Sequence, residues 1–158
     1  MSHGFHLPDI IDGPALTIDD IEAAMVGGPP MVSHVVNHFP PGLYVRECHF
    51  AAGTLGTSMI HKVEHPFILA RGVVEVMSET EGSVTYRAPH VGITLPGTRR
   101  VLHALEDTVW ITVHPNPDDC QDVETIVRRV TAEPDNPLLP AGAGNQWALN
   151  NSTPLLSP

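Results

Sequence analysis

The chain has 158 residues, 42% of them hydrophobic, which suits one domain with its own core. Its formal net charge of −10 argues against general binding to nucleic acid or an anionic membrane, because such binding depends on a basic surface. No apolar run approaches the roughly 20 residues that a membrane helix needs, and the first residues lack the pattern of a signal peptide. We therefore expect a soluble, cytoplasmic protein with no nucleic-acid or membrane partner.

Residues 1–31 are predicted to form an N-terminal arm that contains one short helix. Thr17 is a suitable N-cap, and acidic residues follow in the first turn, where the helix dipole favours them. The apolar pattern ends at Gly27-Gly28, so the helix should end near residue 26.

Residues 32–115 are predicted to form a β-barrel. Eight runs of β-type residues, mostly bounded by turn residues, follow one another without an intervening helix, which favours an all-β jelly roll over a parallel α/β sheet. Several runs alternate between apolar and more polar residues, so one face of each should pack inward. The expected strands cover residues 32–39, 43–51, 57–63, 67–77, 84–87, 91–95, 100–105 and 108–114.

Residues 116–158 are predicted to form a helix followed by an extended, proline-rich arm. Val123, Ile126 and Val130 fall at helical spacing within residues 119–130, so this helix should pack on the barrel. The arm from Thr131 onward carries apolar anchors such as Trp147, and two alternatives stay open: a loose terminus, or contact with a neighbouring subunit.

The two cysteines, Cys48 and Cys120, have no C-x-x-C spacing that would indicate zinc or redox chemistry. We expect both to be buried free thiols. The sequence also lacks a G-x-S-x-G motif, a glycine-rich phosphate loop and a recognisable Cys-His pair, so hydrolases of those kinds are not indicated.

The segment from Gly56 to Gly72 is the part of the chain that most clearly suggests chemistry. His61, Val63 and His65 occupy alternate positions of a predicted strand and should therefore share one face. Two imidazoles on one face can hold a metal ion. The alternative is a pair of histidines that only make hydrogen bonds inside the barrel.

This segment resembles the first motif of the cupin superfamily, in which a glycine precedes two histidines, a glutamate and a second glycine. His61 fits the first ligand, Val63 replaces the second, and His65 stands where the glutamate belongs when positions are counted back from Gly72. The stretch L-P-G-T-R-R-V-L-H, residues 95–103, resembles the second motif, with Arg100 at its ligand position and His103 three residues later. The resemblance covers about residues 43–115 and implies a cupin-like jelly roll.

The resemblance also implies a divalent metal ion, such as Zn, Fe, Ni, Cu or Mn, held by His61, His65 and His103. His103 needs a one-residue register change or a bulge to face inward. Without that change Arg100 faces inward, and its guanidinium beside two imidazoles makes a pocket for a small anion without any metal. A structural role for Arg100, paired with Glu64 or Glu106, is the other reading. The reserve metal ligands are Glu47, His49 and His114.

The function that follows is a small metal-binding cupin-domain protein that also binds a small anionic ligand. Whether it is an enzyme stays open, and a metal-dependent dioxygenase, isomerase or lyase would be the enzymatic classes. The alternative is a non-catalytic assembly protein, because short chains of this kind also resemble phage-associated cupins, and the protein would then be virion-associated. A homo-oligomer is expected on either reading.

Overall fold

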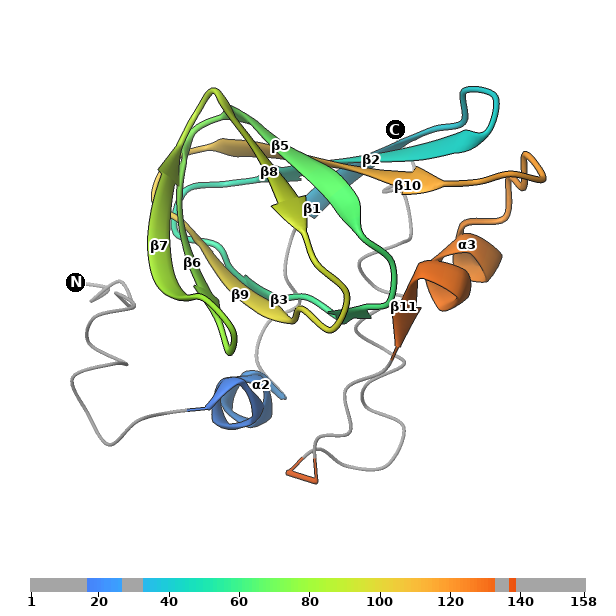
Figure 1. The fold of residues 1–158 in the computed structure, drawn as a ribbon. Coiled ribbons are helices and arrows are strands. Elements are labelled where there is room, and N and C mark those ends of the chain that lie inside the picture. The colour runs from blue at the N-terminus through green and yellow to red at the C-terminus, as the bar shows by residue number, and fades with distance from the viewer. Residues whose placement is uncertain (1–16, 27–32, 133–136, 139–158) are drawn as a thin grey trace.

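Two antiparallel sheets face each other in the computed structural model, which describes residues 17–26, 33–132 and 137–138 (Figure 1). The five-stranded sheet has the order β1 (Ser33–His38), β2 (Leu43–Phe50), β10 (Thr108–Pro115), β5 (His65–Arg71) and β8 (His90–Thr94). The four-stranded sheet has the order β3 (Leu55–Thr57), β9 (Arg100–Ala104), β6 (Val73–Ser78) and β7 (Gly82–Arg87). A short pair joins β4 (Ile60–His61) to β11 (Thr131–Ala132).

The strand order is that of a jelly roll. The order β2-β10-β5-β8 faces the order β3-β9-β6-β7. The chain crosses between the two sheets from β2 to β3, from β3 to β5, from β5 to β6, from β7 to β8, from β8 to β9 and from β9 to β10. β1 adds a fifth strand at the β2 edge. Two four-stranded sheets connected in this way define the eight-stranded jelly roll, so the predicted all-β jelly-roll fold is confirmed.

Gly72 divides the run of residues 67–77, which composition alone predicts to be one strand. The residues before it belong to β5 and those after it to β6, in the opposite sheet. Gly72 has a φ of +93°, and a Cβ atom there would lie only 2.5 Å from the carbonyl oxygen of Asp107. Only glycine fits such a turn, so the single-strand prediction was wrong. The expected single strand over residues 57–63 was also wrong, because this segment contains the last residue of β3 and then the separate short strand β4.

The predicted N-terminal helix is present as α2 (Ile18–Met25). Its capping box is complete, because the Asp20 backbone N–H donates to the Thr17 side chain (3.2 Å) and the Thr17 N–H donates to the Asp20 carboxylate (2.8 Å). Ile18 and Ile21 pack on Val101 of β9, so α2 covers the outer face of the four-stranded sheet (Figure 1). The rest of the expected N-terminal arm lies outside the described residues.

The second helix, α3 (Val123–Val130), is shorter than the predicted 119–130, because Asp119 has a φ of 51° and the Asn116 side chain holds Cys120 in a turn. Ile126 and Val130 are buried. Residues 133–136 and 139–158, where the extended arm is expected, lie outside the described residues. No described helix has both the length and the apolar composition needed to span a membrane.

The space between the sheets is filled by an aromatic and aliphatic core. Phe67, Leu69, Val74, Val76 and Trp110 are all buried in one cluster, and Phe67 stacks on Trp110 with ring centroids 4.6 Å apart. Both cysteines are free thiols; Cys48 is buried, whereas Cys120 is only half-buried. The polar side chains of the interior gather at one end of the barrel, beyond Phe67.

Candidate functional site

Three histidines from three strands meet at that polar end of the barrel. His61 ends β4, His65 begins β5, and His114 lies near the end of β10. The ring centroids of His61 and His65 are 4.7 Å apart, those of His65 and His114 are 4.3 Å apart, and those of His61 and His114 are 6.3 Å apart. The pair His61 and His65 therefore meets as expected, but because the chain turns between two strands and not because one strand carries both.

The turn at Pro96-Gly97 fixes the position of His61. The His61 N–H donates to the Thr98 carbonyl (3.0 Å), and the Gly97 N–H donates to the His61 carbonyl (2.7 Å). This is the turn in which the sequence resembles the second cupin motif. The two segments that carry the resemblance are thus hydrogen-bonded to each other at the site.

Hydrogen bonds to backbone carbonyls fix the tautomers of two of the rings. Nδ1 of His61 lies 3.2 Å from the Thr98 oxygen, and Nδ1 of His65 lies 2.9 Å from the Val63 oxygen. A carbonyl can only accept, so each Nδ1 carries the hydrogen and each Nε2 presents a lone pair. His114 is held through Nε2, 3.0 Å from the Thr112 hydroxyl. Nε2 of His65 and Nδ1 of His114 are buried without a hydrogen-bond partner among the described residues.

Burial keeps all three rings neutral. Desolvation, followed by the neighbouring imidazole of His65, lowers the pKa of His61 to about 4. Desolvation and the two neighbouring imidazoles lower the pKa of His114 to about 3. The pKa of His65 is also lowered, first by burial and then by the positive charge of Arg100. At neutral pH the group therefore presents unprotonated nitrogen atoms.

Arg100 enters the same end of the barrel from β9. Its side chain is buried, its Cζ lies 4.9 Å from the centre of the Phe67 ring, and Nη1 donates to the Thr94 hydroxyl at 2.5 Å. Its Nε is buried without a partner, and no ion pair joins Arg100 to a carboxylate of the described residues, Glu64 and Glu106 included. A buried guanidinium without a carboxylate partner is uncommon, because desolvating a charge is costly.

The structure does not bring His103 to His61 and His65. β9 pairs with β6 in unbroken register, so no bulge turns His103 inward. Val101, two positions away, packs on α2 outside the barrel, and His103 shares that outer side, with Nδ1 3.1 Å from Oε2 of Glu75. Of the two alternatives, Arg100 faces inward and His103 faces outward.

Of the three reserve ligands, only His114 lies at the site. Glu47 and His49 lie on the outer face of the five-stranded sheet. There the Glu47 carboxylate contacts Nε2 of His38 (2.9 Å) and Nε2 of His49 (2.7 Å). Tyr44, which sequence reasoning did not single out, stacks on His114 with centroids 6.0 Å apart, and burial raises its pKa to about 12. Tyr44 lies directly opposite His114 in the sheet. The alternation of inward and outward residues along its strand was the sequence signal that could have identified Tyr44 as an inward residue.

The imidazoles lie close together, but as arranged they do not form a metal site. Within residues 17–26, 33–132 and 137–138, no group of three or more His, Cys, Asp or Glu side chains is arranged to hold a metal ion. The planes of the His61 and His114 rings are only 5° apart, which also indicates a stacked arrangement. Joint ligation of one ion by the three rings requires rotation of their side chains.

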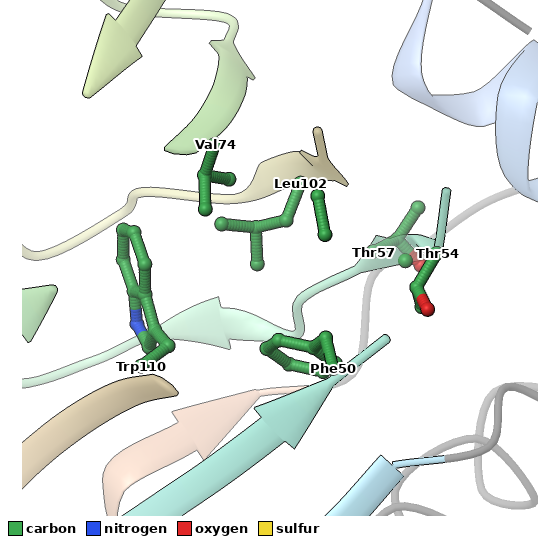
Figure 2. Close-up of a pocket in the computed structure, with 8 residues that line it drawn as sticks. Phe50, Thr54, Thr57, Val74, Leu102 and Trp110 are labelled. Carbon is green, nitrogen blue, oxygen red and sulfur yellow. The ribbon is translucent and has the colours of Figure 1, made fainter. Parts of the chain in front are cut away.

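The opposite end of the barrel contains a small apolar cavity of about 40 Å³. Figure 2 shows Phe50 and Trp110 on one side of it and Val74 and Leu102 on the other. Thr54 also lines the cavity, but no titratable side chain does. The chemistry-bearing side chains of the barrel interior are thus separated from this cavity by the core around Phe67.

No protein-family model matches the chain, and no curated protein matches its sequence. Solved structures do show similarity. An RmlC-like cupin with a double-stranded β-helix fold from Methanocaldococcus jannaschii has a TM-score of 0.47 and 10% identity, and the match covers 57% of this chain and 86% of that one.

The EutQ protein of Clostridium difficile has a TM-score of 0.48 and 14% identity, with 58% of this chain and 74% of that one covered. A salicylate 1,2-dioxygenase variant from Pseudoaminobacter salicylatoxidans has a TM-score of 0.49 and 14% identity, with 63% of this chain but only 32% of that enzyme covered. At such low identity these likenesses concern the fold alone.

Proposed function

We propose that the polar end of the barrel binds a divalent transition-metal ion through His61, His65 and His114, and a small carboxylate-type anion through Arg100. The observation that carries the proposal is the pair of buried, unpartnered imidazole nitrogens, Nε2 of His65 and Nδ1 of His114. A buried polar atom without a partner costs free energy, and ligation of a metal ion would remove that cost. Nothing in the described residues or the comparisons supports the phage-associated alternative.

The donor set fits such an ion. Metal-binding histidines commonly donate their other ring N–H to a backbone carbonyl, which is the arrangement of His61 on Thr98 and of His65 on Val63. Lowered pKa values keep the rings unprotonated, so protons do not compete with a metal at neutral pH. A set of imidazole nitrogens suits zinc, copper, nickel or iron better than magnesium or calcium.

Arg100 would supply the second half of the site. Its guanidinium is buried beside the imidazoles and its Nε has no partner, so it can donate two parallel hydrogen bonds to a carboxylate. An anion there would also offset the repulsion between Arg100 and a bound cation. A divalent ion bound next to it would act as a Lewis acid on the oxygen atoms of such a ligand.

Anion binding without metal is the second candidate function. It is favoured by the stacked arrangement of the rings, which do not converge on a metal position, and by the unpaired charge of Arg100. In that case Arg100 is the main binding group, and the neutral imidazoles only shape the pocket.

A titration with Co²⁺, followed by visible absorption and by calorimetry, tests the metal proposal. The wild-type chain should bind Co²⁺ with the spectrum of nitrogen ligation, and His65→Ala should weaken binding about 100-fold, since each ligand of a small set contributes strongly. His103→Ala is the matched control and should bind as the wild type does. Equal binding by the wild type and His65→Ala, or no binding by either, would reject the metal proposal.

Calorimetry with sodium acetate, before and after chelation, separates the two candidates. If metal and anion bind together, acetate should bind only in the presence of Co²⁺, and Arg100→Met should lose acetate but keep Co²⁺. If the second candidate is correct, acetate binds the chelated wild type and not chelated Arg100→Met. Acetate binding that Arg100→Met leaves unchanged under both conditions contradicts the role given to Arg100.

A further inference from the structure

Two histidines and one glutamate meet on the outer face of the five-stranded sheet, away from the barrel interior. Nε2 of His49 lies 2.7 Å from one carboxylate oxygen of Glu47, and Nε2 of His38 lies 2.9 Å from the other. An ionised carboxylate can only accept, so both imidazoles direct an Nε2 hydrogen at the same group. The three side chains are between 26% and 49% exposed, and exposed pairs of this kind contribute little to stability. Stability alone gives little reason for two imidazoles to meet at one carboxylate.

The pairing of β1 with β2 brings these side chains together. Glu47 and His49 occupy alternate positions of β2 and therefore share its outer face. His34 of β1 lies directly opposite His49, with ring centroids 5.5 Å apart, and His38 shares the same face of β1. Adjacent strands of one sheet thus present three imidazoles and one carboxylate side by side. We call His34, His38, Glu47 and His49 the outer histidine cluster.

We propose that the outer histidine cluster binds a divalent transition-metal ion, such as zinc, through Nε2 of His38, Nε2 of His49 and the carboxylate of Glu47. Two imidazoles and a carboxylate are a donor set that zinc accepts where a water completes its coordination, and His34 is available as a further ligand. The net charge of −10 favours the approach of a cation. This ion lies outside the barrel, so the inference does not depend on the interior site.

The distances show how little the outer histidine cluster must change to hold an ion. In the described part of the chain no such group is already arranged around a metal ion, and here each Nε2 still carries the hydrogen that Glu47 accepts. Ligand atoms at about 2.0–2.1 Å from a tetrahedral zinc ion lie about 3.3 Å from each other. The two nitrogen–oxygen distances are 2.7 and 2.9 Å. Moving the hydrogens to Nδ1 and separating the side chains by about half an ångström gives both pairs the spacing of neighbouring zinc ligands.

Solvent reaches the outer histidine cluster. His34 and His38 are exposed, and an open groove of about 260 Å³ lies beside His49, with Arg71 and Asp107 also in its lining. An ion bound here would exchange with the solution more readily than one enclosed in the barrel. The cluster should therefore lose its zinc during gel filtration and add nothing to the metal that the desalted protein retains.

Calorimetric titration of the full chain with zinc tests the proposal by difference. Glu47→Gln removes the charged ligand but keeps the shape of the side chain, and His49→Ala removes one imidazole. In each variant one zinc site of the wild type should be weakened at least about 10-fold, the loss that even the partners of metal ligands cause. The interior residues are the same in all these chains, so the difference holds whether or not the interior binds zinc. His103→Ala, which breaks a histidine–glutamate pair on the other sheet, is the matched control and should bind as the wild type does.

Nuclear magnetic resonance of the wild type gives a second measurement that needs no variant to fold. Zinc should shift the imidazole signals of His38 and His49 and leave those of His103 in place. Zinc binding that is the same in the wild type, Glu47→Gln and His49→Ala overturns the proposal, because the cluster is then only a hydrogen-bonded group. Equal weakening in His103→Ala, or signals of His38 and His49 that zinc does not move, overturns it as well.

Discussion

The neutral imidazoles are the residue-scale feature with the widest consequences. His61 and His114 have folded-state pKa values of about 4 and about 3, against an ordinary value of 6.5. Below pH 6.5 an unfolded chain takes up protons at both rings, whereas the folded chain does not until the pH reaches those lower values. The metal-free protein should therefore lose stability as the pH falls from 6.5 toward 4, by at most about 1.4 kcal/mol per pH unit for each ring.

Urea denaturation of chelator-treated protein at a series of pH values measures this slope. His114→Gln removes one titrating ring and should flatten the decline between pH 6.5 and 4. An unchanged slope in His114→Gln would show that burial does not hold that imidazole neutral.

At the scale of elements, the turn at Gly72 decides how the jelly roll is built. Its positive φ and the contact of 2.5 Å that a Cβ would make with the Asp107 oxygen both exclude other residues. Gly72→Ala should lower the free energy of unfolding by about 3 kcal/mol, the sum of backbone strain and overpacking. Gly53→Ala has a similar φ, +85°, but open space around it, and should lose only about 1 kcal/mol. Equal losses in urea midpoints would contradict this reading.

The contact between α2 and the barrel depends on Arg99. This buried side chain lies 2.7 Å from Asp19 and 3.4 Å from Glu22 of α2, and 2.7 Å from Glu79 after β6. Arg99→Met should lower the free energy of unfolding by about 3 kcal/mol, because the buried carboxylate of Glu22 loses this ion pair. It should also speed proteolysis near α2.

A surface ion pair is the control for that prediction. Arg129 pairs with Asp118 where both side chains are about half exposed, so Arg129→Met should change stability far less than Arg99→Met does. If the two variants lose equal stability, or if α2 stays protected in Arg99→Met, the helix is held by its apolar contacts alone.

Alternation and turn residues predicted most of the strands, and a capping threonine predicted α2. They missed the break at Gly72, because both β5 and β6 are mainly apolar and the only interruption between them is the short Arg71-Gly72 pair. For the site, alternation showed that Arg100 and His103 face opposite sides of β9, but not which side is the interior. That depends on α2 covering Val101, a contact between distant segments. The place of His114 at the site also depends on a contact between distant segments, because the pairing of β10 with β2 positions it.

On the scale of the whole molecule, the barrel has a polar end and an apolar end. His61, His65, His114 and Arg100 lie at the first, and the small cavity beside Trp110 at the second. The net charge of −10 would draw cations toward the molecule and slow the approach of anions. A site that binds both a metal ion and an anion should therefore bind the anion more readily once the metal ion is in place.

Metal content is the measurement that tests the central claim most directly. Elemental mass spectrometry would be applied to the untagged chain as purified and after incubation with zinc, beside His61→Ala/His65→Ala and His103→Ala. The account predicts near-stoichiometric metal in the wild type and in His103→Ala, and its loss in the double variant. No metal in the wild type even after zinc, or equal metal in the double variant, would contradict it.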